Sequence, residues 1–269
     1  MGQPLLRTFF YGTLSLALWA SSVFATDAAP MTLDATGGEL ALILRQTAMP
    51  EMDPDRLGSI LNRYYQAGYG GADNWEKVAS LRVSGQLKLE AGQFEFNTYQ
   101  KKPHYFKMTL HRPQQTLVFG YDGNVAWQVL GGDSAGVEMD AAETRRFIHG
   151  THFGNHLLYP YALGKQIEYL DTVPVDAAIC HQIRVTLESG LQVDYFIDIR
   201  TYLERKSIIT DLRTGRVTES LSQDYFRESG ITVSRKVVSS ENGVWVSTLE
   251  LDTITFNSGV MPWMFKMPK

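Results

Sequence analysis

The sequence predicts a mainly β protein with a few helices, built as a curved antiparallel sheet with a helical segment over its open side. Two observations predict this fold. Residues 54–68 carry a helical pattern of apolar residues, whereas from about residue 80 onward apolar and polar residues alternate in paired runs. Short glycine-containing segments separate these runs, and strands joined by such short turns must be antiparallel. We expect about 11 strands.

The helical pattern covers residues 54–68, with Asp53 as a candidate N-cap. Apolar residues recur in it at three- and four-residue spacing, which gives the helix one apolar face. That face consists of Leu57, Ile60, Leu61, Tyr64 and Tyr65. Gly70 and Gly71 end the pattern, and a second short helix is expected over residues 74–80.

The first strand is expected over residues 81–89, where odd-numbered positions are mostly apolar and even-numbered positions are polar. Asp122-Gly123 is a strong type I′ hairpin signal, and Asn242-Gly243 predicts a further turn. The alternation is interrupted over residues 140–149, where the spacing is helical. Residues 150–160 are expected to form a loop.

The N-terminus has the features of a cleavable export signal. Residues 1–25 contain one basic residue, a short apolar stretch and small residues before the expected cleavage site. No cysteine lies at that site to be acylated, because the sequence has a single cysteine, Cys180. We therefore expect a periplasmic protein that is not lipidated, with a leader segment over residues 26–53 and one domain over residues 54–269.

The composition argues against several functions. The net charge is −4 and no basic block appears, so nucleic acid is not an expected partner. No nucleophile elbow, zinc-protease helix or phosphate-binding loop is present, and we expect neither an enzyme nor a cofactor. The weak metal candidates are His149, His152 and His156, which could converge on zinc from a loop. A metal-dependent hydrolase is therefore one alternative, and an exposed histidine-bearing loop is the simpler interpretation.

The order of these elements resembles the LolA/LolB-like outer-membrane lipoprotein-sorting proteins, from Ile60 to about Phe265. The matching segments begin with Ile60-Leu-Asn-Arg-Tyr-Tyr, Gly70-Gly71 and Trp75-Glu-Lys-Val-Ala-Ser-Leu-Arg-Val-Ser-Gly-Gln. They continue with Lys102-Pro103 and Tyr121-Asp-Gly-Asn-Val-Ala-Trp127. The most informative are Tyr195-Phe-Ile-Asp-Ile-Arg-Thr-Tyr-Leu-Glu-Arg-Lys206 and then Ser222-Gln-Asp-Tyr225.

The resemblance implies an unclosed antiparallel β-barrel of about 11 strands with a helical lid and an apolar cavity. It implies a periplasmic, monomeric carrier for lipid or lipoprotein acyl chains, with an inner- or outer-membrane transport partner. On this interpretation residues 54–269 form a single LolA-like lipid-binding domain. Some members of the family instead bind a regulatory protein, so a periplasmic sensor with the same fold is the other alternative.

Two surfaces are candidates for the ligand site. The lid is expected to be the helix face with Leu57, Ile60, Leu61 and Tyr64. The cavity wall is expected on the sheet face that carries Val83, Leu87, Leu89, Phe94, Phe96, Phe119 and Trp127. The C-terminal segment Met261–Lys269 is rich in methionine and aromatic residues. It is interpreted either as a last strand tucked into the barrel or as a surface for a membrane or a partner.

Overall fold

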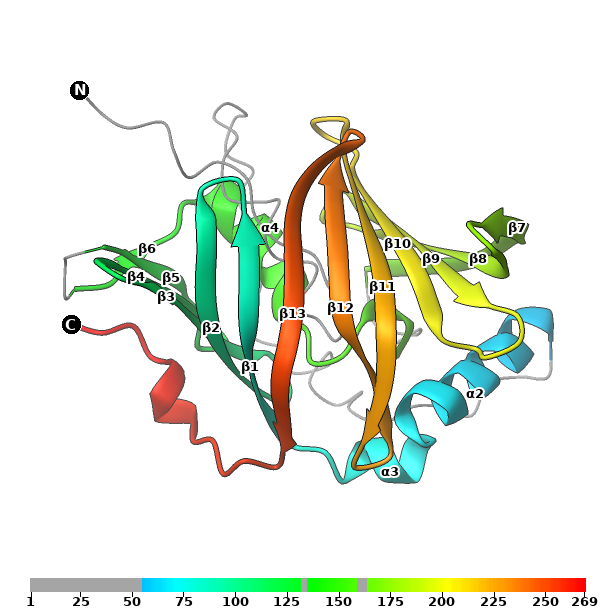
Figure 1. Ribbon diagram of the computed structural model, residues 1–269, viewed down its shortest axis with the longest axis horizontal. Coiled ribbons are helices and arrows are strands. Elements are labelled where there is room, and N and C mark those ends of the chain that lie inside the picture. The colour runs from blue at the N-terminus through cyan, green and yellow to red at the C-terminus, as the bar shows by residue number, and fades with distance from the viewer. Residues whose placement is uncertain (1–54, 132–134, 159–163) are drawn as a thin grey trace.

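The computed structural model describes residues 55–131, 135–158 and 164–269. These residues form a curved sheet with helices packed against it (Figure 1). The predicted signal peptide and leader, together with Asp53 and Pro54, lie outside these described residues. None of the helices in this part of the chain is both long enough and apolar enough to cross a membrane.

The sheet has thirteen strands, each antiparallel to its neighbours, in the order β6-β5-β4-β3-β2-β1-β13-β12-β11-β10-β9-β8-β7. The first half contains β1 (Ser80–Leu89), β2 (Gly92–Lys101), β3 (Tyr105–Arg112), β4 (Gln115–Tyr121), β5 (Ala126–Leu130) and β6 (Val137–Glu138). The second half contains β7 (Lys165–Val175), β8 (Ala178–Leu187), β9 (Leu191–Asp198), β10 (Glu204–Asp211), β11 (Arg216–Glu228), β12 (Ile231–Glu241) and β13 (Val244–Phe256). The predicted fold class is confirmed, with two strands more than expected.

The two halves meet in the middle of the sheet, where β1 pairs with β13. The edge strands are β6 and β7, which are consecutive in the sequence but lie at opposite ends of the strand order. Among the described residues no ladder joins these two edges, so the barrel is not closed. The segment between β6 and β7 connects the two edges and carries the helix α4 (Ala141–Thr151) and the short 3-10 helix η1 (His156–Leu158).

The first described helix is α2 (Arg56–Tyr69), followed by α3 (Ala72–Glu76). Asp55 caps α2, because its side chain accepts a hydrogen bond from the Gly58 N–H. The helix therefore begins two residues later than predicted, with Asp55 and not Asp53 as its cap. The second helix ends earlier than the predicted range of residues 74–80, because Ser80 is already the first residue of β1.

Helix α4 confirms the helical spacing predicted over residues 140–149. Asp140 and Glu143 form a reciprocal capping box at its N-terminus. The helix continues through Gly150, and η1 follows it, so the prediction of a loop over residues 150–160 was wrong in these two places. Gly150 is buried, so tertiary packing outweighs the low intrinsic helix propensity of glycine.

The two turn predictions have different outcomes. Asn242 and Gly243 form a two-residue turn between β12 and β13, with positive φ angles of 49° and 81°, as predicted. Asp122-Gly123 also lies in a turn, but the connection between β4 and β5 has four residues. The Asp122 carboxylate accepts hydrogen bonds from the N–H groups of Asn124 and Val125, and this side-chain contact supports the longer loop.

Candidate ligand-binding site

One face of the sheet, here called the inner face, carries the main core cluster and receives the helices. Over β1 to β4 the inner face is lined by large apolar side chains that stand opposite one another on neighbouring strands, and each is at most 5% exposed. These cross-strand pairs are Leu87 with Phe94, Phe96 with Leu110, and Met108 with Phe119. The inner face of β1 to β4 is therefore largely apolar, with Thr98 and Gln100 of β2 as fully buried polar members.

Most of the residues predicted for the lid and the cavity wall come together in this core. Ile60, Leu61 and Tyr64 of α2 are buried in one cluster with sheet residues, and Leu57 packs against it while partly exposed. The predicted wall residues in the same cluster are Val83, Leu87, Leu89, Phe94, Phe96 and Phe119. Their side chains are packed together, and their contact with a ligand stays a prediction.

Trp127 is the predicted wall residue that lies apart. It stands opposite Gly120 in the β4–β5 ladder, whereas Phe119 stands opposite Gln128, so the strand alternation places Trp127 on the outer face. Its indole N–H donates to the carbonyl of Phe265, 2.8 Å away. Any loop of even length after Tyr121 places Phe119 and Trp127 on opposite faces, so the prediction that both line the wall was wrong.

Helix α2 is fixed to the second half of the sheet by polar contacts as well as by its apolar face. Arg56 donates to the hydroxyl of Tyr169 on β7 at 2.6 Å, and its guanidinium lies 4.2 Å from the centre of that ring. Arg63 donates to the hydroxyl of Tyr202 at 2.7 Å. Both arginines are at the surface, so these contacts stabilise the docked helix much less than the burial of its apolar face does.

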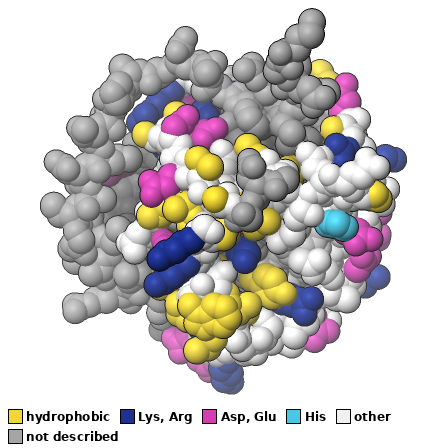
Figure 2. All heavy atoms as spheres, turned by 90° about the vertical axis from the view of Figure 1, so that its left-hand side faces the viewer, with side chains coloured by type: hydrophobic (Ala, Val, Ile, Leu, Met, Phe, Trp, Pro, Cys, Tyr) yellow, Lys and Arg dark blue, Asp and Glu magenta, His cyan; other side chains and the backbone are white. Residues whose placement is uncertain are grey.

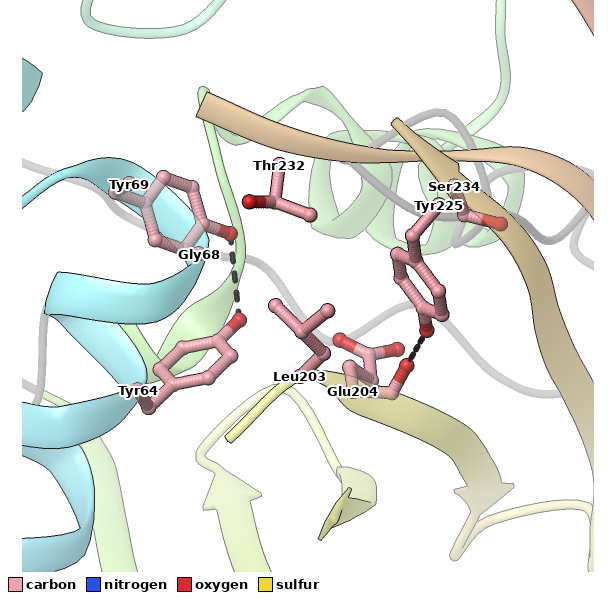
Figure 3. A pocket seen from close by; sticks show the side chains of 8 residues that line it. All are labelled: Tyr64, Gly68, Tyr69, Leu203, Glu204, Tyr225, Thr232 and Ser234. Atoms are coloured by element: carbon pink, nitrogen blue, oxygen red, sulfur yellow. Dashed lines mark hydrogen bonds between the residues drawn. The ribbon is translucent and has the colours of Figure 1, made fainter. Parts of the chain in front are cut away.

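A polar network lies beneath α2, around a small cavity of about 30 Å³. Figure 3 shows Tyr64 and Tyr69 of α2 on one side of this cavity and Glu204 of β10 with Tyr225 of β11 on the other. The buried amide of Asn155 connects the two sides, because it donates to the Tyr64 hydroxyl at 2.6 Å and to the Glu204 carboxylate at 3.3 Å.

Glu204 is the group in this network whose pKa lies closest to neutral pH. Burial raises the pKa of its carboxyl to about 7, although hydrogen bonds from Ser207 and Asn155 oppose the shift. The carboxyl therefore changes charge near neutral pH, directly below the helix that was predicted to be a lid. The sequence contained no signal for this site, since Asn155, Glu204 and Tyr64 are distant in the chain.

In the second half of the sheet the apolar residues of the inner face are interrupted by a polar row. A row of buried serines crosses four neighbouring strands and continues to Leu89 on β1. The row consists of Ser207, Ser220, Ser239 and Ser247. The hydroxyls of Ser220 and Ser239 are 3.1 Å apart and share a hydrogen bond. Alternating serines at Ser220 and Ser222 of β11 were visible in the sequence and were not assigned a role.

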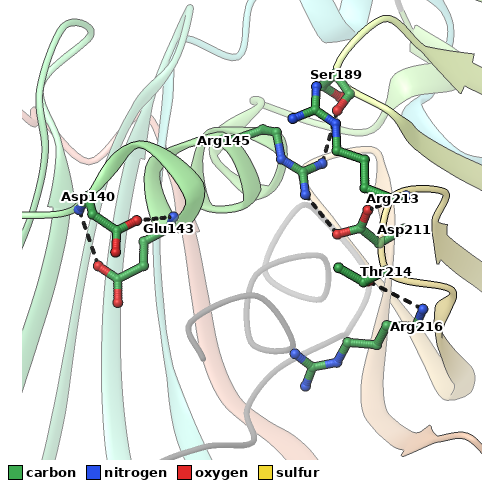
Figure 4. Close-up of polar contacts among 8 residues, drawn as sticks. All are labelled: Asp140, Glu143, Arg145, Ser189, Asp211, Arg213, Thr214 and Arg216. Carbon is green, nitrogen blue, oxygen red and sulfur yellow. Dashed lines mark hydrogen bonds and ion pairs between the residues drawn. The ribbon is translucent and has the colours of Figure 1, made fainter. Parts of the chain in front are cut away.

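Charged groups lie at the end of this polar half, where α4 meets the hairpins of β8–β9 and β10–β11. Arg145 of α4 donates to the carboxylate of Asp211 at 2.7 Å and to the carbonyl of Ser189 at 2.9 Å (Figure 4). The side chains of Arg145 and Asp211 are each 7% exposed. Arg216 of β11 forms an ion pair with Glu241 of β12. Helix α4 is thereby anchored to the second half of the sheet.

The same helix reaches the first half of the sheet through Phe147, whose ring meets that of Phe106 on β3 edge-on at 5.7 Å. Both rings are fully buried. Helix α4 therefore connects the apolar half and the polar half across the inner face.

The three predicted histidines come together with a fourth, His104. The ring centres of His149 and His156 are 4.4 Å apart, those of His152 and His156 are 4.7 Å apart, and those of His104 and His152 are 4.8 Å apart. Burial lowers the pKa of His149 to about 3 and that of His104 to about 4, so these imidazoles are neutral at pH 7. The histidines are largely buried, and the interpretation of an exposed histidine loop was wrong.

Three of these histidines line a cavity of about 220 Å³ together with Arg145 and Lys165. Burial lowers the pKa of Lys165 to about 7. Nevertheless, no group of three or more histidine, cysteine, aspartate or glutamate side chains in the described parts of the chain is placed so that it could hold a metal ion. The hydrolase alternative therefore receives no support from the geometry.

The C-terminal segment lies on the outer face of the first half of the sheet. Its 3-10 helix η2 (Pro262–Phe265) buries Phe265 against Tyr105, with ring centres 5.4 Å apart, and leaves Trp263 69% exposed. Figure 2 shows this side of the molecule, where hydrophobic side chains gather next to lysine and arginine side chains. Of the two interpretations of this segment, a last strand tucked into the barrel was therefore wrong, and a surface for a membrane or a partner stays a prediction.

Comparisons with known proteins define the fold class. No family model matches the sequence, and no curated protein matches it either. Solved structures do match, and they show that the chain has the LolA-like fold, an open antiparallel β-barrel with helical elements. The resemblance noted in the sequence is thus confirmed for the fold.

Three of these structures cover most of the chain. A LolA superfamily protein from Nitrosomonas europaea is 11% identical, with a TM-score of 0.55, over 77% of this chain and 96% of its own. A putative outer membrane lipoprotein-sorting protein domain from Vibrio parahaemolyticus is 10% identical, with a TM-score of 0.53, over 77% and 95%. A DUF1329 family protein from Desulfovibrio piger is 12% identical, with a TM-score of 0.57, over 79% and 98%.

Proposed function

We propose that the protein is a periplasmic carrier that binds lipid or lipoprotein acyl chains on the inner face of its sheet. The observation that carries this proposal is the apolar wall of β1 to β4 in a sheet that does not close, with helices α2 and α4 packed against the same face. The fold it shares with a putative lipoprotein-sorting domain supports the same role. A cleavable signal over residues 1–25 would place the protein where such cargo travels.

The physical basis is a competition between the protein's own contacts and those of the ligand. Each methylene group moved from water to an apolar site contributes about 0.8 kcal/mol. An acyl chain on the inner face of β1 to β4 would therefore be held firmly, and it would compete with α2 for the core cluster in which the helix is buried. It would be released when the helix returns, so neither binding nor release requires catalysis.

Native mass spectrometry of the protein purified from its own periplasm tests the proposal. We expect additional mass that corresponds to an acyl compound and that is recovered when delipidated protein is incubated with a lipid or an acylated peptide. Protein without additional mass, and without uptake of either compound, would contradict the proposal.

A pair of variants on α2 tests its role as a lid. Leu57 packs against the core while partly exposed, whereas Ser59 of the same helix is exposed. We expect Leu57→Glu to retain the acyl chain roughly tenfold more strongly and to release it more slowly, because weakening the competing contact of the helix by about 1.4 kcal/mol changes the equilibrium constant by that factor. Ser59→Glu, with the same added charge, should leave release unchanged. Equal release rates in the two variants would exclude α2 as the lid.

A further inference from the structure

Arg146 on α4 is a buried cation that the contacts described so far leave unused. The residue is 6% exposed. None of the described residues accepts a hydrogen bond from two of its guanidinium nitrogens, Nε and Nη2, both of which are shielded from solvent. A buried charge is normally paired, because leaving water without a partner costs several kcal/mol. The position of Arg146 therefore favours an additional partner.

The carboxylates near Arg146 are engaged elsewhere. Asp211 accepts from Arg145 and from the backbone N–H of Arg213. Asp140 and Glu143 are bound to each other's backbone N–H groups in the capping box of α4 (Figure 4). Although the charges of Asp211, Asp140 and Glu143 act on the region, none of them forms an ion pair with Arg146 among the described residues.

The guanidinium also lies within the electrostatic reach of two further arginines. Burial lowers the pKa of Arg146, and the charges of Arg145 and Arg216 lower it further. Arg216 stands on the inner face, in the same alternating series as Thr218 and Ser220 of β11, and its Nε also has no acceptor among the described residues. The ladder places Arg216 opposite Asp211, the carboxylate that Arg145 contacts, so these cationic groups lie in one region where α4 approaches the polar half of the inner face.

The neighbour of Arg146 in the helix, Phe147, points into the apolar half, where it contacts Phe106. One turn of α4 thus presents an apolar ring to the first half of the sheet and, near the second, a guanidinium with two nitrogens from which none of the described residues accepts. We propose that Arg146, with Arg216 beside it, binds the oxyanion headgroup, a carboxylate or a phosphate, of an acyl ligand. This inference rests on the proposed function and names the class of ligand, an amphiphile with an acidic head.

Guanidinium groups are suited to this task because their planar fork matches the two oxygens of a carboxylate or phosphate. The expected signature is a preference for charged over uncharged heads on the same chain. Hydrogen bonds to charged groups predict a preference of roughly 10- to 100-fold.

Isothermal titration calorimetry with the purified, delipidated protein at pH 7.5 tests this preference. The ligands are dodecanoate, dodecyl phosphate and dodecan-1-ol, with acetate and inorganic phosphate as heads without a chain. We expect the two charged amphiphiles to bind roughly 10- to 100-fold more tightly than the alcohol, and the chainless anions to bind far more weakly.

The variant Arg146→Met separates a binding role from a structural one. We expect it to reduce the preference for charged heads to less than about threefold. It should also raise the melting temperature without ligand, because it removes a buried charge with which none of the described residues forms an ion pair. The exposed residue Arg213, on the adjacent hairpin, provides the control Arg213→Met, which should change neither property.

Each remaining outcome overturns the headgroup assignment in a different way. Equal affinity for dodecanoate and dodecan-1-ol would exclude the headgroup site and leave acyl binding intact. Equal affinity for dodecyl phosphate and inorganic phosphate would make this a site for a free anion. A lower melting temperature in Arg146→Met, matched by Glu143→Gln, would make Arg146 a structural partner of Glu143. Failure of every amphiphile to bind would contradict the proposed function itself.

Discussion

The two halves of the inner face share one continuous sheet but differ in chemistry. In the first half, paired positions such as Phe96 and Leu110 are large and apolar. In the second half, the corresponding positions include the serine row, and the row's end is flanked by charged groups such as Asp211 and Arg216. This difference teaches where an apolar and a polar end of the proposed ligand would each find matching side chains.

The largest effect is expected from removing an aromatic ring in the apolar half. Phe96 is fully buried, so Phe96→Ala should lower the free energy of unfolding by about 3–5 kcal/mol. Ser220→Ala in the polar half should lower it by only about 1 kcal/mol, the typical contribution of one hydrogen bond. Urea unfolding measures both values. Equal losses would show that the two halves do not differ energetically.

The buried ion pair at the end of the polar half should also be costly to break. Arg145→Met leaves the carboxylate of Asp211 buried without its partner, and removing one member of such a pair costs about 3–5 kcal/mol. This is opposite in sign to the stabilisation expected for Arg146→Met one residue later. Thermal unfolding of the two variants compares them directly. Similar melting temperatures would show that the two arginines have the same role.

Glu204 should make the region beneath α2 sensitive to pH. Its folded-state pKa of about 7 lies above the ordinary value of 4.5, so the stability it contributes is complete below about pH 4.5 and is lost as the pH rises through 7. Glu204→Gln should remove this dependence. The unfolding free energy of Glu204→Gln minus that of the unsubstituted protein should increase by about 2–3 kcal/mol between pH 4.5 and pH 8. An advantage that is independent of pH would contradict the raised pKa.

The histidine cluster should act in the opposite direction. The pKa of His149 is lowered to about 3 from 6.5, so its contribution to stability is present above pH 6.5 and is lost as the pH falls toward 3. Between pH 7 and pH 5 the unfolding free energy of His149→Leu should fall by about 2 kcal/mol less than that of the unsubstituted protein. Urea unfolding at the two pH values measures this. An unchanged loss would show that His149 is not a buried neutral imidazole.

The sequence predicted most of the fold because the fold depends on local patterns. The alternation over residues 81–89, the Asn242-Gly243 turn and the helical spacing over residues 140–149 are each visible within about ten residues. The two-residue strand β6 was missed because it is too short to show an alternation. Trp127 was assigned to the wrong face because its apolar character does not identify a face, whereas its pairing with Gly120 places it opposite to Phe119.

The candidate site was only partly predictable because its polar members depend on tertiary contacts. Glu204, Asn155 and Tyr64 are distant in the sequence. They come into contact only in the tertiary structure, where the second half of the sheet lies beneath α2. Similarly, Arg146 looked like any charged residue on a helix, and its burial follows from α4 lying between the two halves of the sheet. Apolar periodicity identifies the wall of a site, whereas the polar groups that give it specificity are set by topology.

Photo-crosslinking tests the central claim, that an acyl chain lies against the apolar half of the inner face, most directly. The delipidated protein would be irradiated with a dodecanoate analogue that carries a diazirine near the end of its chain, and the modified peptides would be identified by mass spectrometry. We predict crosslinks to inner-face residues of β1 to β4, such as Phe96, Met108 and Phe119. Crosslinks confined to the outer-face segment around Trp263, or to the serine row, would contradict this account.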